Sequence, residues 1–266
     1  MKTIKLNNGV IAPLFGFGTY RINPQVTEKY VTDAINAGYR LFDTAQYYQN
    51  EAQVGRAINN SGIPRSEFFL TTKARTGGYE ATKKSIEESL ETAQQDYFDL
   101  MLVHFPMPDY LGTYRALEEA YQEGKLRAIG ISNFGIGDMT KVIDSFATVP
   151  AVNQIETNVY IQDKPLTKFM NQHGIVQEAY APLGEGTNPM FNDPYLKQLA
   201  QKYNKSVAQI MLKFLVQSGF MTIPGSTNPQ HIKENIEIFD FKLTPEEMGQ
   251  LRQLDHGTSS WLGYQG

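Results

Sequence analysis

The sequence predicts an α/β fold, a (β/α)8 TIM barrel with an N-terminal β-hairpin cap. The length of 266 residues suits this fold, which typically takes about 250. Short apolar runs alternate with amphipathic segments along the chain, a pattern that indicates parallel βαβ units. No linker rich in proline, glycine and serine interrupts this pattern. We therefore expect one domain over residues 1–266.

The hairpin is the first expected element. Residues 3–6 and 10–11 are short runs of β-forming character, and Asn8-Gly9 between them suits a tight turn with positive φ. Because the hairpin precedes the alternating pattern, we expect it to cap the barrel rather than to join its wall.

Eight strands and their helices follow the hairpin. The strands are expected at residues 14–18, 40–43, 68–73, 98–104, 128–132, 152–155, 175–180 and 221–223. Amphipathic helices are expected at residues 27–37, 52–60, 81–93, 114–123, 138–146, 166–173 and 207–217. We also expect extra helices after strands seven and eight. Two late helix starts are clear, since Asn228-Pro229 fits an N-cap followed by proline and Thr244-Pro-Glu-Glu247 fits a capping box.

A doubly wound open sheet is the main alternative fold. It would carry a glycine-rich turn of the form G-x-G-x-x-G after its first strand. The segment Gly16-Phe-Gly18-Thr-Tyr20 lacks that spacing, so the closed barrel is favoured.

The composition excludes several classes of function. A net charge of −4 without a basic stripe argues against nucleic acid and anionic membranes as partners. The absence of cysteine excludes disulfides, a thiolate nucleophile and thiolate metal ligands. Neither a signal-peptide core nor an apolar run of about 18 residues is present, so we expect a cytoplasmic protein, and a monomer.

Three consecutive strands end in residues that can move a proton. Asp43 ends strand two, Lys73 ends strand three and His104 ends strand four, where barrel enzymes place catalytic groups. Tyr48 lies in the loop after Asp43. A free phenol has a pKa of about 10 and donates its proton poorly at pH 7 unless nearby charge stabilises the anion. Together these residues predict a catalytic quartet.

Each member of the quartet also has a structural interpretation. Asp43 and Lys73 could form a buried ion pair, His104 could be a hydrogen-bonded core histidine, and Tyr48 could be a packing residue. The joint arrangement favours a functional site, because buried ion pairs are weak stabilisers and persist mainly at sites.

Several motifs occur in a fixed order around these residues. Segment 38–55 carries Asp43, Glu51, Val54 and Gly55 in the register of a long family signature. The later motifs are Thr71-Thr-Lys73, Leu102-Val-His104-Phe-Pro106, Gly130-Ile-Ser132-Asn133-Phe134, Asn153-Gln154-Ile-Glu156 and Ala179-Tyr180-Ala-Pro-Leu183-Gly184. With these motifs the chain resembles the aldo-keto reductase family over essentially its whole length, in the bacterial form with short substrate loops.

The resemblance implies an NAD(P)H-dependent reductase of aldehydes and ketones. Tyr48 would protonate the carbonyl oxygen as the nicotinamide delivers hydride to the carbon. Lys73, held by Asp43, would lower the pKa of Tyr48 from about 10 toward 7, which needs about 4 kcal/mol of anion stabilisation. His104 would orient the carbonyl and donate a hydrogen bond to the developing alkoxide. No metal is needed, and the sequence offers no ligand cluster for one.

The resemblance also implies a set of cofactor-binding residues at the strand ends and after strand eight. Ser132, Asn133 and Gln154 would bond the carboxamide, and Tyr180 would stack on the nicotinamide ring. The full set is Gly18, Thr19, Tyr20, Asp43, Ser132, Asn133, Gln154, Tyr180, Leu183, Gly184, Gly186, Gly225, Ser226, Thr227, His231, Glu234 and Asn235.

Two of these positions depart from the family pattern. Most relatives carry lysine where this chain has Gly225 and arginine where it has His231, and those cations hold the 2′-phosphate of NADPH. Ser226, Thr227 and the following helix N-terminus could still bind a phosphate. We therefore expect NADPH with a reduced preference, and some use of NADH.

The expected wall of the substrate pocket also departs from the family pattern. Phe105 stands where many relatives have tryptophan, and Ala74-Arg75 replaces the usual Leu-Trp. The expected lining is Tyr20, Tyr47, Phe105, Met107, Tyr110 and Trp261. An open aromatic mouth favours small to medium carbonyl substrates, including dicarbonyls.

Two other functions compete with the reductase. The same barrel could serve as a cofactor-sensing or structural protein with little turnover. A phosphate-binding isomerase barrel would need a glycine-rich phosphate site after strands seven and eight. Gly184-Glu-Gly186 matches such a site only weakly.

Overall fold

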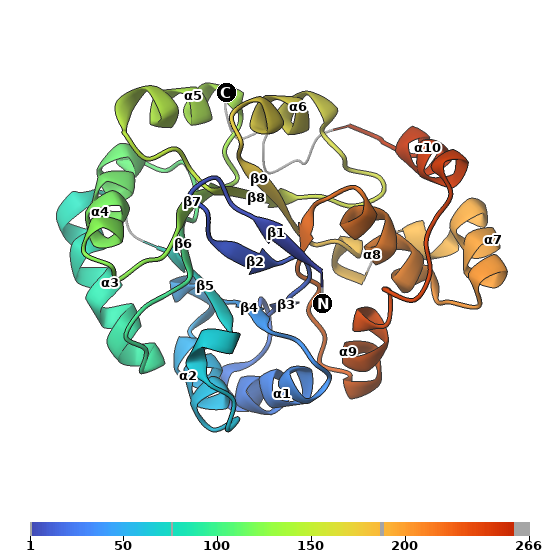
Figure 1. Cartoon of the computed structure of the whole chain (residues 1–266), viewed down its shortest axis with the longest axis horizontal. Helices are drawn as coiled ribbons and strands as arrows, with labels where there is room; N and C mark the ends of the chain where they lie inside the picture. The colour runs from blue at the N-terminus through green and yellow to red at the C-terminus, as the bar shows by residue number, and fades with distance from the viewer. Residues whose placement is uncertain (1, 76, 187–188, 258–266) are drawn as a thin grey trace.

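A ring of parallel strands surrounded by helices dominates the computed structural model, which describes residues 2–75, 77–186 and 189–257 (Figure 1). The barrel strands are β3 (Phe17–Gly18), β4 (Leu41–Asp43), β5 (Phe69–Ala74), β6 (Leu100–Val103), β7 (Ile129–Ser132), β8 (Val152–Glu156), β9 (Val176–Tyr180) and β10 (Met221–Thr222). They pair with their neighbours in chain order. The eight-stranded (β/α)8 barrel expected from the sequence is confirmed.

The ring closes between its first and last strands. Phe15 and Thr222 form a parallel bridge, and the amide of Gly16 donates a 2.9 Å hydrogen bond to the carbonyl of Thr222. One step further along, the amide of Gly18 donates to the carbonyl of Pro224 at 3.1 Å. These bonds remove the two open edges that an eight-stranded sheet would otherwise expose.

Two glycines make this closure tight. A Cβ atom built on Gly225 would lie 2.5 Å from the carbonyl oxygen of Gly18, and one on Gly18 would lie 2.8 Å from the carbonyl oxygen of Ile223. Both contacts are with backbone, so no side-chain rotation could relieve them. We call the contact between Gly18 and segment 223–225 the seam.

The N-terminal hairpin covers one end of the barrel, as expected. It pairs β1 (Thr3–Lys5) with β2 (Ile11–Pro13) and lies across the middle of the ring (Figure 1). Asn7 and Asn8 at its turn donate to the carbonyls of Pro150 and Arg127, which precede β8 and β7. The hairpin therefore closes the amino-terminal end of the strands and leaves the carboxyl end free.

The helices lie outside the ring. They are α1 (Pro24–Asn36), α2 (Glu51–Asn59), α3 (Tyr79–Ala93), α4 (Tyr110–Gln122), α5 (Ile136–Ser145), α6 (Lys164–Gln172), α7 (Pro194–Tyr203), α8 (Val207–Gln217), α9 (Pro229–Ile236) and α10 (Pro245–Gln253). The expected extra helices are α7, between β9 and α8, and α10, after α9. Both late helix starts are confirmed, with Asn228 capping α9 and a Thr244–Glu247 capping box on α10.

Several helices begin earlier than the sequence predicts, because a polar cap starts them before the apolar pattern does. Helix α1 begins at Pro24, where the Asn23 side chain accepts from the Gln25 amide. The Asp109 side chain starts α4 in the same way by accepting from the Gly112 amide. No helix of the described residues is long and apolar enough to cross a membrane.

Candidate active site

The carboxyl ends of β4, β5 and β6 bring the predicted quartet together. Asp43 is the last residue of β4, Lys73 lies one residue before the end of β5, and His104 directly follows β6. Tyr48 ends a short 3-10 helix, η1 (Gln46–Tyr48), in the loop after β4. Parallel pairing of β4, β5 and β6 aligns these ends side by side.

Lys73 is the centre of the site. Its side chain is fully buried, and an ammonium has three protons to donate. Its Nζ lies 2.6 Å from Asp43 Oδ1, 3.0 Å from the carbonyl oxygen of Thr44 and 3.2 Å from the Tyr48 hydroxyl. Each proton thus has one acceptor, and the lysine cannot turn away from Tyr48 without losing a buried hydrogen bond.

Charge inside the barrel keeps Lys73 protonated. Burial alone would lower the pKa of Lys73, but the Asp43 carboxylate and the Tyr48 oxygen outweigh burial, so this pKa is raised. Burial raises the pKa of Asp43, and the Lys73 ammonium offsets part of that rise. The second oxygen of Asp43, Oδ2, accepts a 2.8 Å hydrogen bond from Gln154 Nε2.

The pKa of Tyr48 differs from the sequence-based expectation. Burial raises it above its usual 10, and the Lys73 ammonium lowers it by a smaller amount. The expected net fall toward 7 is therefore wrong for the protein alone, because the prediction counted the lysine charge and neglected desolvation. A raised pKa keeps Tyr48 protonated at neutral pH, which is the state that a proton donor needs.

His104 is neutral in this environment. Burial and then the nearby Lys73 charge lower its pKa to about 2. Its ring lies edge-on to the rings of Tyr47 and Tyr48 and stacks on Phe105 at 4.6 Å. A neutral imidazole donates from one nitrogen, and Nδ1 is buried without a hydrogen-bond partner among the described residues. His104 can therefore offer one hydrogen bond without bringing a second charge into the site.

The residues expected to hold the carboxamide form a connected polar group beside the quartet. Ser132 Oγ donates to the backbone carbonyl of Gln154 at 2.9 Å, and the Asn133 amide donates to Ser132 Oγ and to the carbonyl of His104. The Tyr180 hydroxyl donates to Asn133 Oδ1 at 2.8 Å. Asn133 adopts a positive φ of 64°, so its backbone is turned away from the strand direction.

The segment after β10 lies on the surface. Asn228 caps α9 and its own amide donates to Ser226 Oγ at 3.1 Å, while Thr227 and His231 are exposed. Glu234 accepts from the Gln230 side chain, and Asn235 is buried. This arrangement leaves an accessible helix N-terminus next to the seam, which suits an anion such as a phosphate.

The loops after β9 and β3, the two strands on either side of β10, meet over the carboxyl end of the barrel. Gly184 and Glu185 adopt positive φ in the loop after β9, and Glu185 forms an ion pair with Arg21 from the loop after β3. Leu183 packs against the core, and Gly186 ends the described part of this loop. The side chain of Thr19 is buried and donates to the carbonyl of Asp43, so it supports the site from within the barrel.

Four of the six residues expected around the substrate lie with the quartet or at its edge. Tyr20 and Tyr47 are about half exposed and contact the rings of Tyr48 and His104 respectively. Phe105 stacks on His104, as described above. Met107 is also about half exposed and lines a small cavity together with His104 and Phe105.

The other two expected lining residues are Tyr110 and Trp261. Tyr110 begins α4, donates to Asp138 on α5 at 2.8 Å and packs edge-on against Phe134. These contacts place Tyr110 in the packing between α4 and α5, and its role at the substrate mouth stays a prediction. Trp261 lies outside the described residues.

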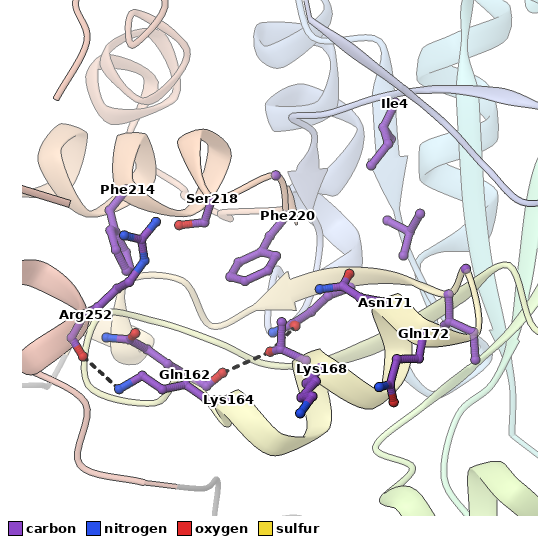
Figure 2. Close-up of a pocket in the computed structure, with 16 residues that line it drawn as sticks. Ile4, Gln162, Lys164, Lys168, Asn171, Gln172, Phe214, Ser218, Phe220 and Arg252 are labelled. Carbon is purple, nitrogen blue, oxygen red and sulfur yellow. Dashed lines mark hydrogen bonds between the residues drawn. The ribbon is translucent and has the colours of Figure 1, made fainter. Parts of the chain in front are cut away.

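A cavity of the described residues lies away from the candidate site. It has a volume of about 760 Å³ and lies between α6 and the end of α8, with Lys164, Lys168 and Arg252 around it (Figure 2). None of the quartet lines it. The candidate site is thus defined by its side chains and not by the size of a cavity.

Sequence reasoning missed one acidic residue in the site. Glu178 on β9 is fully buried and lies opposite Gln154 in the strand pairing. The signal was available: an acid two residues before Tyr180 in a strand faces the same side as Tyr180. Asn50 was also missed; it is buried, accepts from Thr44 Oγ1 at 2.6 Å and donates to the carbonyl of Thr19.

The described residues fit a nicotinamide dinucleotide. Amide and hydroxyl groups of Ser132, Asn133 and Gln154 lie beside the quartet, as a carboxamide requires, and the buried Nδ1 of His104 lacks a described partner. At the far end the accessible N-terminus of α9 suits a phosphate.

Comparisons with known proteins agree with this geometry. The sequence profile of the Aldo/keto reductase family matches residues 14–256. The chain is 42% identical over 257 residues to glyoxal reductase of Bacillus subtilis, with 95% of this chain and 92% of that protein covered. It is 40% identical over 270 residues to morphine 6-dehydrogenase of Pseudomonas putida, with 96% and 91% covered.

Solved structures give the same result. An aldo-keto reductase from a Medee basin deep-sea metagenome library superposes with a TM-score of 0.93 at 38% identity, covering 96% of each chain. An aldo-keto reductase of Bombyx mori, solved in complex with NADP, superposes with a TM-score of 0.90 at 37% identity, covering 96% of this chain and 93% of that one. On these matches, the chain belongs to the aldo/keto reductase family of NAD(P)H-dependent oxidoreductases.

Proposed function

We propose that the chain reduces small aldehydes and ketones, 1,2-dicarbonyls among them, to alcohols with NADPH. The observation that carries this proposal is the contact between Lys73 and the Tyr48 hydroxyl at 3.2 Å, with Asp43 holding the lysine from behind. Because Tyr48 accepts its hydrogen bond from Lys73, the proton of its own hydroxyl stays available to a substrate.

Tyr48 acts as the proton donor. When bound, NADPH supplies a hydride to the carbonyl carbon. Tyr48 gives its proton to the carbonyl oxygen, and the Lys73 ammonium stabilises the phenolate that remains. Neutral His104 orients the carbonyl by one hydrogen bond. A positioned general acid typically contributes a factor of about 10²–10⁴ in rate.

Ser132, Asn133, Gln154 and Tyr180 hold the reacting end of the cofactor in this proposal. Ser226, Thr227 and the N-terminus of α9 hold the phosphate of the adenosine end, with Glu234 and Asn235 next to the adenine. His231 stands where the family pattern has arginine and lacks the planar guanidinium that binds a phosphate through two hydrogen bonds, so NADPH is preferred only modestly over NADH.

The substrate class follows from the mouth of the site and from the relatives. The rings of Tyr20 and Tyr47 are about half exposed beside the quartet, which supports an open mouth. Relatives at about 40% identity are named glyoxal reductase and methylglyoxal reductase. Small dicarbonyls are therefore the first compounds to test.

Turnover of NADPH with 4-nitrobenzaldehyde and with methylglyoxal tests the proposal. Wild type should oxidise NADPH with both, and Tyr48→Phe should lose a factor of about 10²–10⁴ in kcat while binding NADPH as before. The Tyr30→Phe variant, which removes a hydroxyl from α1 outside the site, serves as the matched control. If wild type only binds NADPH, or if Tyr48→Phe turns over at the wild-type rate, the reductase proposal fails and a cofactor sensor takes its place.

The proposal includes the cellular location, the oligomeric state and the domain organisation of the enzyme. We place it in the cytoplasm as a monomer with a single barrel domain. Light scattering coupled to size-exclusion chromatography should give the mass of one 30.0 kDa chain.

A further inference from the structure

Glu178 is a buried acid in the site that the proposed reaction does not use. It lies in the middle of β9, its side chain is fully buried, and it faces Gln154 across the β8–β9 pairing. Burying a carboxyl group is costly unless its oxygens are hydrogen-bonded. One of them, Oε1, has no partner among the described residues. Fold stability therefore gives no reason for an acid at this position.

The hydrogen bonds of the Gln154 side chain give a reason for an acid at position 178. Its Nε2 donates to Asp43 Oδ2 at 2.8 Å and to Glu178 Oε2 at 2.8 Å. A primary amide has two protons, so both are used by these two carboxyl groups. The remaining polar atom of the amide is Oε1, and no described residue donates a hydrogen bond to it.

Two acceptors are needed to fix the amide. With Asp43 alone, one amide proton would have a partner, and the side chain could rotate about its last torsion angle, which is broad. A flipped amide would place its oxygen against two carboxyl groups, where it would exchange two donated hydrogen bonds for at most one, from the proton of Glu178, and would face the Asp43 oxygen. Glu178 and Asp43 together hold the NH2 group inward and leave Oε1 for a ligand.

The protonation state of Glu178 is compatible with its accepting a hydrogen bond from Gln154. Burial and the nearby Asp43 carboxylate raise the pKa of Glu178 to about 8, while Gln154 and Lys73 lower it by smaller amounts. Glu178 is thus largely neutral at pH 7, and its carbonyl-type oxygen can accept from Gln154 without adding a second buried anion beside Asp43.

We propose that Glu178 is a positioning residue, which orients the Gln154 amide so that Oε1 is presented as a hydrogen-bond acceptor to the carboxamide NH2 group of the nicotinamide. The ligand in this statement rests on the proposed function. The orientation of Gln154 is a property of the protein alone and can be tested without cofactor.

The variants Glu178→Gln and Glu178→Met distinguish the effect of the hydrogen-bond acceptor from the effect of side-chain volume. Glutamine is neutral and keeps an acceptor at the same distance, whereas methionine fills the space and accepts weakly. Gln177→Met is the matched control, because Gln177 directly precedes Glu178 on β9 and, outside the site, donates a hydrogen bond to Thr157 and accepts one from Thr167.

The first measurement is NMR of the side-chain amide of Gln154 in the protein without cofactor. Both protons should exchange with solvent more than about tenfold more slowly than those of exposed Gln172 in wild type and in Glu178→Gln, and this protection should be lost in Glu178→Met. Fast exchange in wild type would overturn the proposal, and this arm needs no variant to fold.

The second measurement is calorimetric titration with NADPH. Glu178→Met should weaken binding by about tenfold, and Glu178→Gln and Gln177→Met should bind as wild type does. In a Gln154→Met background, Glu178→Met should cost no further affinity. An additive loss in that background, or an equal loss in Glu178→Gln, would overturn the positioning role.

The two arms also separate this inference from the proposed function. Protected Gln154 protons in a wild-type protein that does not bind NADPH would refute the cofactor and leave the orientation by Glu178 standing. Unprotected protons in a protein that binds NADPH and reduces carbonyls would refute the role of Glu178 alone.

Discussion

The two ends of the proposed dinucleotide site are built differently. At the reacting end, Lys73 is fully buried and all three of its protons have acceptors, and Asp43 uses both of its oxygens. At the adenosine end, Thr227 and His231 are exposed, and the polar contacts of Ser226 and Asn228 are local to one turn.

This difference separates two kinds of residue. A buried and saturated network cannot lose one member without leaving another polar group unpaired, so its substitutions should affect both stability and rate. An exposed helix terminus can exchange side chains at little cost to folding, so its substitutions should change ligand preference. The seam is the exception, because it lies at the adenosine end and yet is tightly packed.

The largest effect is expected for Lys73→Met. Removing the ammonium leaves the Asp43 carboxyl buried beside an apolar side chain, which should reduce the free energy of unfolding by about 3–5 kcal/mol. Without the cation next to Tyr48, kcat should fall by a factor of about 10²–10⁴. Urea unfolding at pH 7 and steady-state kinetics measure the two effects.

Lys29→Met is the surface control for this variant. Lys29 pairs with Asp33 along the exposed face of α1, a pair whose loss should cost no more than about 0.5 kcal/mol. Equal urea midpoints for the two variants would show that the buried pair is not part of a coupled network.

A second effect concerns acid stability. His104 has a folded-state pKa of about 2 against an ordinary value of 6.5, so between these values the unfolded chain binds more protons than the native protein. The stability linked to His104 is therefore present above pH 6.5 and is lost as the pH falls below it, by up to about 1.4 kcal/mol per pH unit.

His104→Asn should flatten this dependence. The free energy of unfolding, measured from pH 7 down to pH 5, should fall less steeply in the variant than in wild type. His173→Asn, at an exposed position on the end of α6, should keep the wild-type slope. Parallel curves for wild type and His104→Asn would mean that His104 is protonated in the native protein.

The smallest effect is expected at the adenosine end. His231→Arg should shift the ratio of NADPH to NADH affinity toward NADPH by about tenfold, because a guanidinium adds charge-assisted hydrogen bonds to a 2′-phosphate. Calorimetric titration with both cofactors measures this ratio. An unchanged ratio would place the 2′-phosphate away from α9.

Gly225→Lys is expected to behave differently from His231→Arg, although the family resemblance implies a cation at both positions. The new Cβ would lie 2.5 Å from the carbonyl of Gly18, so the backbone must shift before the lysine can reach a phosphate. We expect a lower unfolding midpoint and little gain in NADPH affinity. A gain without loss of stability would show that the seam can open.

The sequence predicted most of the fold because strands, helices and caps depend on local patterns. All eight barrel strands lie within a few residues of their expected positions, and Asp43, Tyr48, Lys73 and His104 come together as proposed. The carboxyl ends of parallel strands lie at the same end of a barrel. The order of the strands along the chain therefore predicts which strand-end residues are neighbours.

The errors arose where three-dimensional packing decides. The direction of the Tyr48 pKa depends on burial, which no motif reports. Glu178 was counted only as part of a strand, although its alternation with Tyr180 placed it inside the barrel.

The seam has a consequence for how such an enzyme can acquire a new cofactor. Position 225 belongs at once to the proposed phosphate-binding segment and to the joint that closes the ring of strands. A library that varies residue 225 alone will therefore return mostly glycine, for reasons of folding that hide any effect on the nucleotide. Randomising residues 18, 223 and 225 together would let the joint and the cofactor preference change in the same step.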